Sequence, residues 1–209
     1  MTDQLSLYNG ALRNIKERAL STISDDVPAR YALDDVYDAS LQACLEAGLW
    51  NFATRTVEID SSTTIEPPFG YAYAFEQPND FVRLIAISAS DTQYPTLDEY
   101  TDEAGVWYAN ADVLYISYVS NDDAYGLNLA RWPQNYVRAV ELDLAVLIAP
   151  HITNFSANEL MALQKRADRA MSNARSKDAA NQAVLRPSPG RLVRSRLGAP
   201  VDQRRRRST

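Results

Sequence analysis

Apolar positions near both ends of the chain recur at the three- and four-residue spacing that is typical of amphipathic helices. This pattern predicts four helices, over residues 3–22, 24–48, 134–150 and 156–178. Ser156 and Glu159 have the spacing of a capping box at the start of the fourth helix. That helix would bury small residues and expose a basic face, formed by Lys165, Arg166, Arg169, Arg175 and Lys177.

Between the two pairs of helices the pattern changes to the alternation of half-buried strands. It predicts strands over residues 54–60, 71–75, 81–87, 106–109 and 113–119. Asn110, Ala111 and Asp112 separate the last two strands and are typical of a hairpin turn. No helix-length segment divides the strands, which favours antiparallel pairing. We therefore expect an α+β fold, a four-helix bundle with an inserted small antiparallel β-sheet region.

Charge is distributed unevenly along the chain. The 209 residues include 21 basic and 27 acidic side chains, but residues 186–209 alone carry eight arginines against one acid. Prolines and glycines interrupt this segment, and its few apolar side chains cannot form a core. We expect an extended basic C-terminal arm that orders on a partner. The predicted domains are a helical bundle (1–53 and 128–180), an inserted β-region (54–127) and the arm (181–209).

Few residues offer the chemistry of a catalytic or metal site. Cys44 and His151 are the single cysteine and histidine, which excludes an intrachain disulfide and a metal site built from several such ligands. The seven glycines are isolated, so no phosphate-binding loop is present. Neither a signal peptide nor a membrane-spanning apolar stretch is recognisable, and we expect the chain to be made in a cytoplasm. We expect no catalytic residue, cofactor or metal.

Two acidic clusters are candidates for the catalytic or metal-binding residues that we do not expect. They are Asp34, Asp35 and Asp38, and Asp98, Glu99, Asp102 and Glu103. Either could supply the carboxyl pair of a glycosidase, with Asp35 or Glu103 essential, or oxygen ligands for calcium or magnesium. Their spacing matches no calcium-binding loop, which favours a solvated or partner-facing surface.

An aromatic group in the strand region also has two interpretations. It comprises Tyr71, Tyr73, Phe75, Trp107, Tyr108, Tyr115 and Tyr118. A platform for stacking single-stranded nucleic acid would need basic residues among the rings. Only Arg55 and Arg83 are available there, which favours a sheet core or a protein interface.

As a whole, the chain resembles the tail tubular protein A family of short-tailed bacteriophages, the head-to-tail adaptors beneath the portal. The resemblance is carried by the segments LYNGALR at 7–13, LDDVY at 33–37, CLEAGLWNFA at 44–53, FGYAYAF at 69–75, YVSND at 118–122, YGL at 125–127, RWP at 131–133 and VRSR at 193–196. These segments follow the family's order along nearly the whole chain. The closing run of arginines, 204–207, departs from the family pattern.

The resemblance implies a structural protein at the head-tail junction of a virion, and no enzyme. Copies would form a twelvefold ring between the portal protein and a tail nozzle of the tail tubular protein B type. DNA would pass through without sequence-specific binding, and no membrane would be involved. The implied portal-binding residues are Arg186, Arg191, Leu192, Val193, Arg194, Ser195, Arg196 and Leu197. The implied contacts to a neighbouring subunit or the nozzle are Trp50, Tyr71, Tyr73, Trp107 and Trp132.

Two alternatives from other classes stay open. The arginine-rich arm could make the chain a nucleic-acid-binding protein, with affinity that falls steeply as salt rises. A carboxylate pair could instead make it a virion-associated hydrolase of cell-wall glycan.

Overall fold

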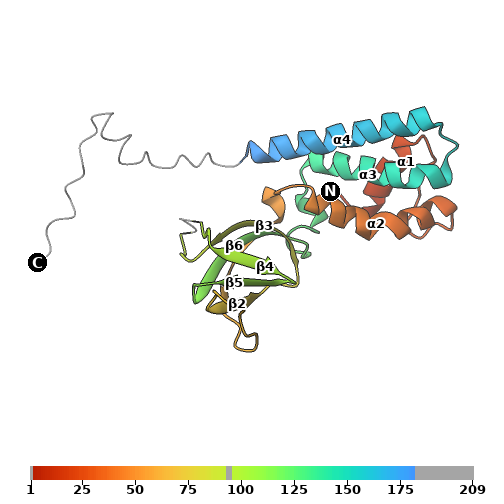
Figure 1. The fold of residues 1–209 in the computed structure, drawn as a ribbon. Helices are drawn as coiled ribbons and strands as arrows, with labels where there is room; N and C mark the ends of the chain where they lie inside the picture. Colours follow the sequence, from red (N-terminus) through yellow and green to blue (C-terminus); the bar gives the residue numbers. More distant parts are fainter. Residues whose placement is uncertain (1, 93–95, 182–209) are drawn as a thin grey trace, which may run out of the picture.

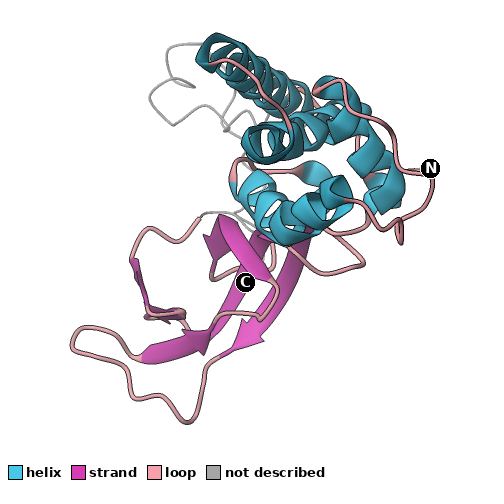
Figure 2. Ribbon diagram, turned by 90° about the vertical axis from the view of Figure 1, so that its right-hand side faces the viewer, coloured by secondary structure: helices cyan, strands magenta, loops and turns pink. Residues whose placement is uncertain are grey.

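The computed structural model describes residues 2–92 and 96–181 and has an α+β fold, with the helices gathered beside two antiparallel sheets (Figures 1 and 2). The helices are α1 (Gln4–Asn14), α2 (Pro28–Glu46), α3 (Gln134–Ile152) and α4 (Ala157–Ala179), with short 3-10 turns η1 (Asn51–Ala53) and η2 (Leu129–Arg131). The strands are β1 (Thr54–Asp60), β2 (Tyr73–Glu76), β3 (Phe81–Ser88), β4 (Tyr100–Glu103), β5 (Val106–Ala109) and β6 (Val113–Ser120).

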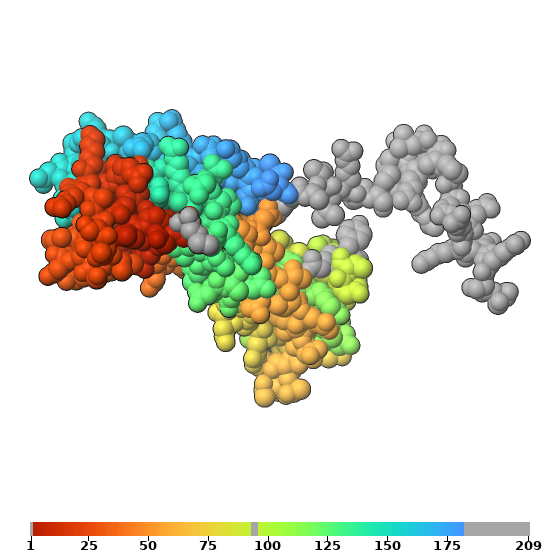
Figure 3. Space-filling view, turned by 180° about the vertical axis from the view of Figure 1, so that it is seen from behind, coloured from red at the N-terminus to blue at the C-terminus, as the bar shows by residue number. Residues whose placement is uncertain are grey.

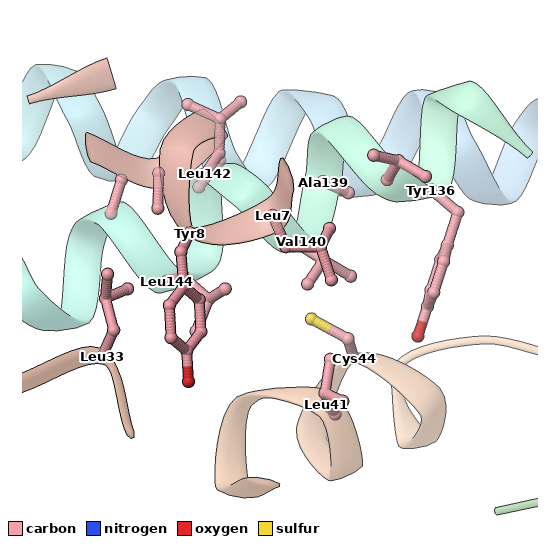
Figure 4. Packing of buried hydrophobic residues seen from close by; sticks show 14 of the residues in the cluster. Leu7, Tyr8, Leu33, Leu41, Cys44, Tyr136, Ala139, Val140, Leu142 and Leu144 are labelled. Carbon is pink, nitrogen blue, oxygen red and sulfur yellow. The ribbon is translucent and has the colours of Figure 1, made fainter. Parts of the chain in front are cut away.

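Helix α3 is the centre of the helical part. Helices α1, α2 and α4 each pack against it, with α4 above α3 and α2 below it in Figure 1. Because neighbours cover it on several sides, α3 is apolar around most of its circumference. Figure 4 shows part of the resulting core, where Leu7 and Tyr8 of α1 lie near Val140 and Leu144 of α3.

Local signals explain where two of the helices begin. Asp3 caps α1 by accepting a hydrogen bond from the Ser6 amide at 2.8 Å. The predicted capping box of α4 is confirmed, since Ser156 and Glu159 satisfy each other's backbone amides.

Helix α1 is shorter than its periodicity predicts. It ends at Asn14 instead of Thr22, and Lys16 adopts the left-handed conformation with φ 63°. Leu20 is nevertheless buried, because Asn9 holds its backbone through hydrogen bonds of 2.7 and 3.1 Å. The apolar spacing that predicts a continued helix thus comes from a loop that folds back onto the core.

The β-region contains two three-stranded sheets, ordered β1-β6-β3 and β2-β5-β4, with every pair antiparallel. It has its own core of buried side chains, Phe75, Ile87, Trp107, Ala109, Leu114, Ile116 and Tyr118. The predicted four-helix bundle with an inserted small antiparallel sheet is therefore wrong. The β-region is a substantial part of the molecule with its own hydrophobic core, and is not a small insert. The helices form no simple bundle, because three of them are arranged around α3.

The predicted hairpin around Asn110 is also wrong. Strands β5 and β6 belong to different sheets, and the Asn110 side chain instead accepts a hydrogen bond from the Ala72 amide at 2.9 Å. The hairpin joins β4 to β5, where Ala104 (φ 51°) and Gly105 (φ 84°) form its two-residue turn.

Two tryptophans secure the chain where it passes between the helices and the sheets. The Trp50 indole N–H donates to the carbonyl oxygens of Cys44 and Leu45 at 3.0 and 3.1 Å, at the end of α2. The Trp132 indole N–H donates to the Gly126 carbonyl at 2.8 Å, just before α3. Both segments that connect the two parts are thus fixed by buried hydrogen bonds.

Candidate functional site

The three tryptophans expected at an interface lie in the interior of the chain. Trp50 and Trp132 pack edge-on against Tyr136, with ring centroids 4.7 and 4.9 Å apart, and are 1% and 5% exposed. Trp107 is fully buried in the β-region beside Phe81. Because the three side chains are buried in the cores of the chain itself, they have no free surface for the predicted contacts.

The other predicted interface residues are more accessible. Tyr73 is exposed at the start of β2, whereas Tyr71 is half-buried and hydrogen-bonds Thr101 at 2.6 Å. The predicted portal-binding residues, between Arg186 and Leu197, lie outside the described residues.

Each acidic cluster contributes one carboxylate to structural contacts, Asp34 in the first and Asp102 in the second. Asp34 accepts from the Tyr8 hydroxyl at 2.7 Å and forms an ion pair with Arg30 at 2.6 Å. Asp102 accepts from the Trp107 indole at 3.1 Å and from the Gln77 amide at 2.8 Å. Within residues 2–92 and 96–181, no three His, Cys, Asp or Glu side chains gather in a way that could hold a metal ion.

Cys44 and His151 lie in contrasting environments. Cys44 is buried, and desolvation raises the pKa of its thiol to about 12, so the thiol stays protonated at neutral pH. His151 is exposed in the last turn of α3, beside a groove of about 560 Å³ that the 17–32 segment lines.

A groove of about 250 Å³ between α3 and α4 concentrates positive charge. Arg138 comes from α3, and Arg166 and Arg169 come from α4. The groove forms because α4 turns small residues, among them Ala167 and Ala174, towards α3, while longer polar side chains flank the contact. We call this the basic groove.

The arginines of the basic groove keep most of their positive charge available, although Arg138 interacts with the partly buried carboxyl group of Glu141. Arg166 donates to the side-chain oxygen of Asn14 at 3.0 Å, and Lys177 lies 3.5 Å from that of Asn135, so both partners are neutral amides. In the part of the chain that the structure describes, no ion pair involves Arg138, Arg166 or Arg169. Arginines that form no ion pair are suited to bind an anionic partner.

The outward face of α2 has the opposite charge. Asp35, Asp38 and Glu46 are exposed on the side of the helix opposite to the buried Leu33 and Leu41. Unlike Asp34, none of the three forms an ion pair with a described residue. This surface can therefore attract a cationic partner.

An exposed apolar residue marks the tip of the β-region. Phe69 is fully exposed in the loop between β1 and β2, which projects away from the helices at the lowest point of the molecule in Figure 3. The Phe69 side chain therefore belongs to neither of the two hydrophobic cores.

The sequence pattern predicts only part of these surfaces. It identified Arg166, Arg169 and Lys177 as a basic face, but Arg175 points elsewhere and donates to the Ala47 carbonyl at 3.3 Å. It missed Arg138, which a polar position within the mainly apolar pattern of α3 could have indicated.

In the described ranges, no helix is both long enough and apolar enough to cross a membrane. Comparison with protein-family models and with curated proteins finds no match to this chain.

Proposed function

We propose that the chain is a structural subunit of a head-to-tail connector of a short-tailed bacteriophage. Its copies form a ring between the portal protein and the tail nozzle, and DNA passes through the centre of the ring. The observation that carries this proposal is the position of the family-like segments at the joint between the helices and the sheets.

The segment 44–53 runs from the end of α2 through η1 and contains Trp50, whose indole closes the end of that helix. The segments 118–122, 125–127 and 131–133 lead from β6 back to α3. Within them the Trp132 indole binds the Gly126 carbonyl, and Gly126 packs closely against the Ser120 backbone. These residues fix how two parts of the molecule are joined, which is a mechanical role, and supports a scaffold in preference to an enzyme.

Charge also supports the proposal. The whole chain has a net charge of −6 although its last 24 residues are strongly basic, so the body of the protein is acidic. An acidic body around a channel repels the phosphate backbone and prevents DNA from adhering during passage. The arm is the segment with the charge and composition to bind the portal after it orders.

Binding to the purified portal protein tests this function. Analytical ultracentrifugation would compare the full chain, a chain that ends at residue 185, and a full-length control in which only Arg204–Arg207 are alanines. We expect a ring-sized mass increment on the portal for the full chain and none for the shortened chain. Absence of portal binding by the full chain would refute the proposal, and equal binding by both would remove the arm's role.

The basic groove favours one second candidate, a nucleic-acid-binding protein. Three arginines that contact three phosphates would give a slope of log affinity against log salt of about −2.7 on duplex DNA. Fluorescence anisotropy with labelled DNA would measure that slope for the full chain and for an Arg138→Ala, Arg166→Ala, Arg169→Ala variant. Tight, salt-dependent binding that these substitutions abolish would favour this candidate over the connector.

A further inference from the structure

Two helices carry rows of complementary side chains at the same spacing. On α2 the row is Asp35, Asp38, Gln42 and Glu46, and on α4 it is Arg166, Arg169, Asn173 and Lys177. Both rows have steps of three, four and four residues, so each follows one face of its helix for about 16 Å. We call them the acidic row and the basic row. Placed side by side, they align acid with base at three positions and amide with amide at the fourth.

The rows cannot satisfy each other within one chain. In Figure 1 helix α4 lies above α3 and helix α2 lies below it, and the basic row borders the groove that α4 forms with α3. The acidic row lies on the face of α2 opposite to its buried residues. In the described parts of the chain, neither row contains a side chain in an ion pair.

The direction of the helices suits a contact between copies. Both α2 and α4 run from the far end of the helical part towards the sheets, as the colours in Figure 1 show. In a ring of many subunits, neighbours differ by a small rotation, so α2 of one copy stays nearly parallel to α4 of the next. The aligned rows then meet in the same order, from Asp35 with Arg166 to Glu46 with Lys177.

We propose that the acidic row of one copy of this chain packs along the basic row of a second copy, in a repeating head-to-tail contact. This inference rests on the proposed ring and names the surfaces that build it. The two surfaces differ, so each copy keeps one of each for the next neighbour, and the contact closes into a ring when the rotation between copies divides a full turn evenly.

The residues in and beside the rows determine how closely the two helices can pack and how strong the contact is. Ala39 is a small exposed residue beside the acidic row, which leaves room for a neighbouring helix. Water and salt screen exposed ion pairs, so one contact is weak and sensitive to salt. A closed ring is stable because every copy makes two such contacts.

Sedimentation of the full chain over a concentration series in about 50 mM salt tests the proposal. The wild-type chain is expected to form assemblies that dissociate in about 500 mM salt. Variant Arg166→Ala, Arg169→Ala loses the basic row, and variant Asp35→Ala, Asp38→Ala loses the acidic row. Each should associate roughly tenfold more weakly or stay monomeric.

Mixing the two variants gives the sharpest result. Each retains the surface that the other lacks, so the mixture should form a dimer of one copy of each and nothing larger. Matched controls remove two charges elsewhere, as Arg18→Ala, Lys165→Ala and as Glu99→Ala, Asp123→Ala, and should assemble like the wild type. An engineered disulfide between Asp38→Cys in one copy and Arg169→Cys in another should form, whereas a pair of Asp38→Cys with Lys177→Cys should not.

Several outcomes would overturn this proposal. They are a wild-type chain that stays monomeric at every concentration, unchanged assembly in either row variant, and no dimer in the mixture. Loss of DNA binding in the basic-row variant with self-association intact would assign that row to nucleic acid instead. Portal binding is measured separately. If the row variants bind the portal as well as the wild type and also assemble like it, the proposed function stands and this inference is refuted.

Discussion

Glu141 occupies a tight contact between α1 and α3. Its side chain fills the space beside Gly10, where any larger residue would collide with it. Burial raises the pKa of Glu141 above its ordinary value of 4.5, although Arg13 and Arg138 partly oppose this shift. The folded chain thus holds a proton that the unfolded chain releases, and stability falls as pH rises from 4.5 through the folded-state pKa.

Replacing this carboxyl should remove that pH dependence. The variant Glu141→Gln is expected to be more stable than the wild type at pH 7, with a difference that shrinks as the pH falls towards 4.5. Urea denaturation at several pH values measures it. A constant difference across that range would show that the titration of Glu141 is not the cause.

Tyr136 contains a buried hydroxyl that forms no hydrogen bond with the described residues. An unsatisfied buried hydroxyl costs free energy, so Tyr136→Phe should raise the free energy of unfolding by about 1 kcal/mol. Tyr8→Phe is the matched control, because the Tyr8 hydroxyl donates to Asp34 and accepts from Gln4, and it should lower stability by about 1 kcal/mol. Chemical denaturation measures the free energy of unfolding of both variants. Changes of opposite sign would support this account, and a lower stability in both variants would contradict it.

Among the elements, the β4–β5 hairpin contains a residue that its turn does not favour. Both central residues have positive φ, and alanine is strained there where asparagine is tolerated. We expect Ala104→Asn to stabilise the protein by about 0.5–1 kcal/mol and Gly105→Ala to destabilise it by a similar amount or more. Thermal unfolding followed by circular dichroism checks both, and a lower melting temperature for Ala104→Asn would refute the turn assignment.

Helices and strands differ in how far their sequence pattern could be interpreted. The alternation over 54–60 matches β1, because that strand has one face turned inwards along its whole length. Strand β4 was missed because its sequence, Tyr-Thr-Asp-Glu, is mostly polar and forms the edge of a sheet. The end of α1 was missed because Leu20 is buried from a loop, and periodicity does not distinguish a loop residue from a helical one.

At the scale of the whole molecule, the local pattern could not show which strands share a sheet. Asn110, Ala111 and Asp112 separate β5 from β6, but the chain passes there from one sheet to the other, so the predicted hairpin does not form. The charged rows were visible in sequence as a basic face and an acidic cluster. Their complementarity became apparent only once the helices were placed around α3 and shown to run in the same direction.

The joint between the two parts depends on the absence of a side chain at Gly126. A Cβ atom there would collide with the carbonyl oxygen of Ser120, which belongs to the backbone and cannot move aside. We expect Gly126→Ala to cost about 1–3 kcal/mol and Gly126→Ser to cost more. Chemical denaturation measures both losses, and an unchanged midpoint for Gly126→Ala would show that the joint can relax.

The first and last strands of the β-region are neighbours, with Thr54 at the start of β1 paired with Val119 near the end of β6. Residues 55–118 therefore form a segment whose two ends are held side by side by strand pairing. Strand β3 still contacts α2, where Arg83 donates to the Glu46 carbonyl at 3.0 Å, but insertions or deletions in loops far from that contact, including the one that carries Phe69, can be accommodated without displacing a helix. Evolution can therefore revise what this end of the molecule meets while its helices, and whatever they assemble, stay the same.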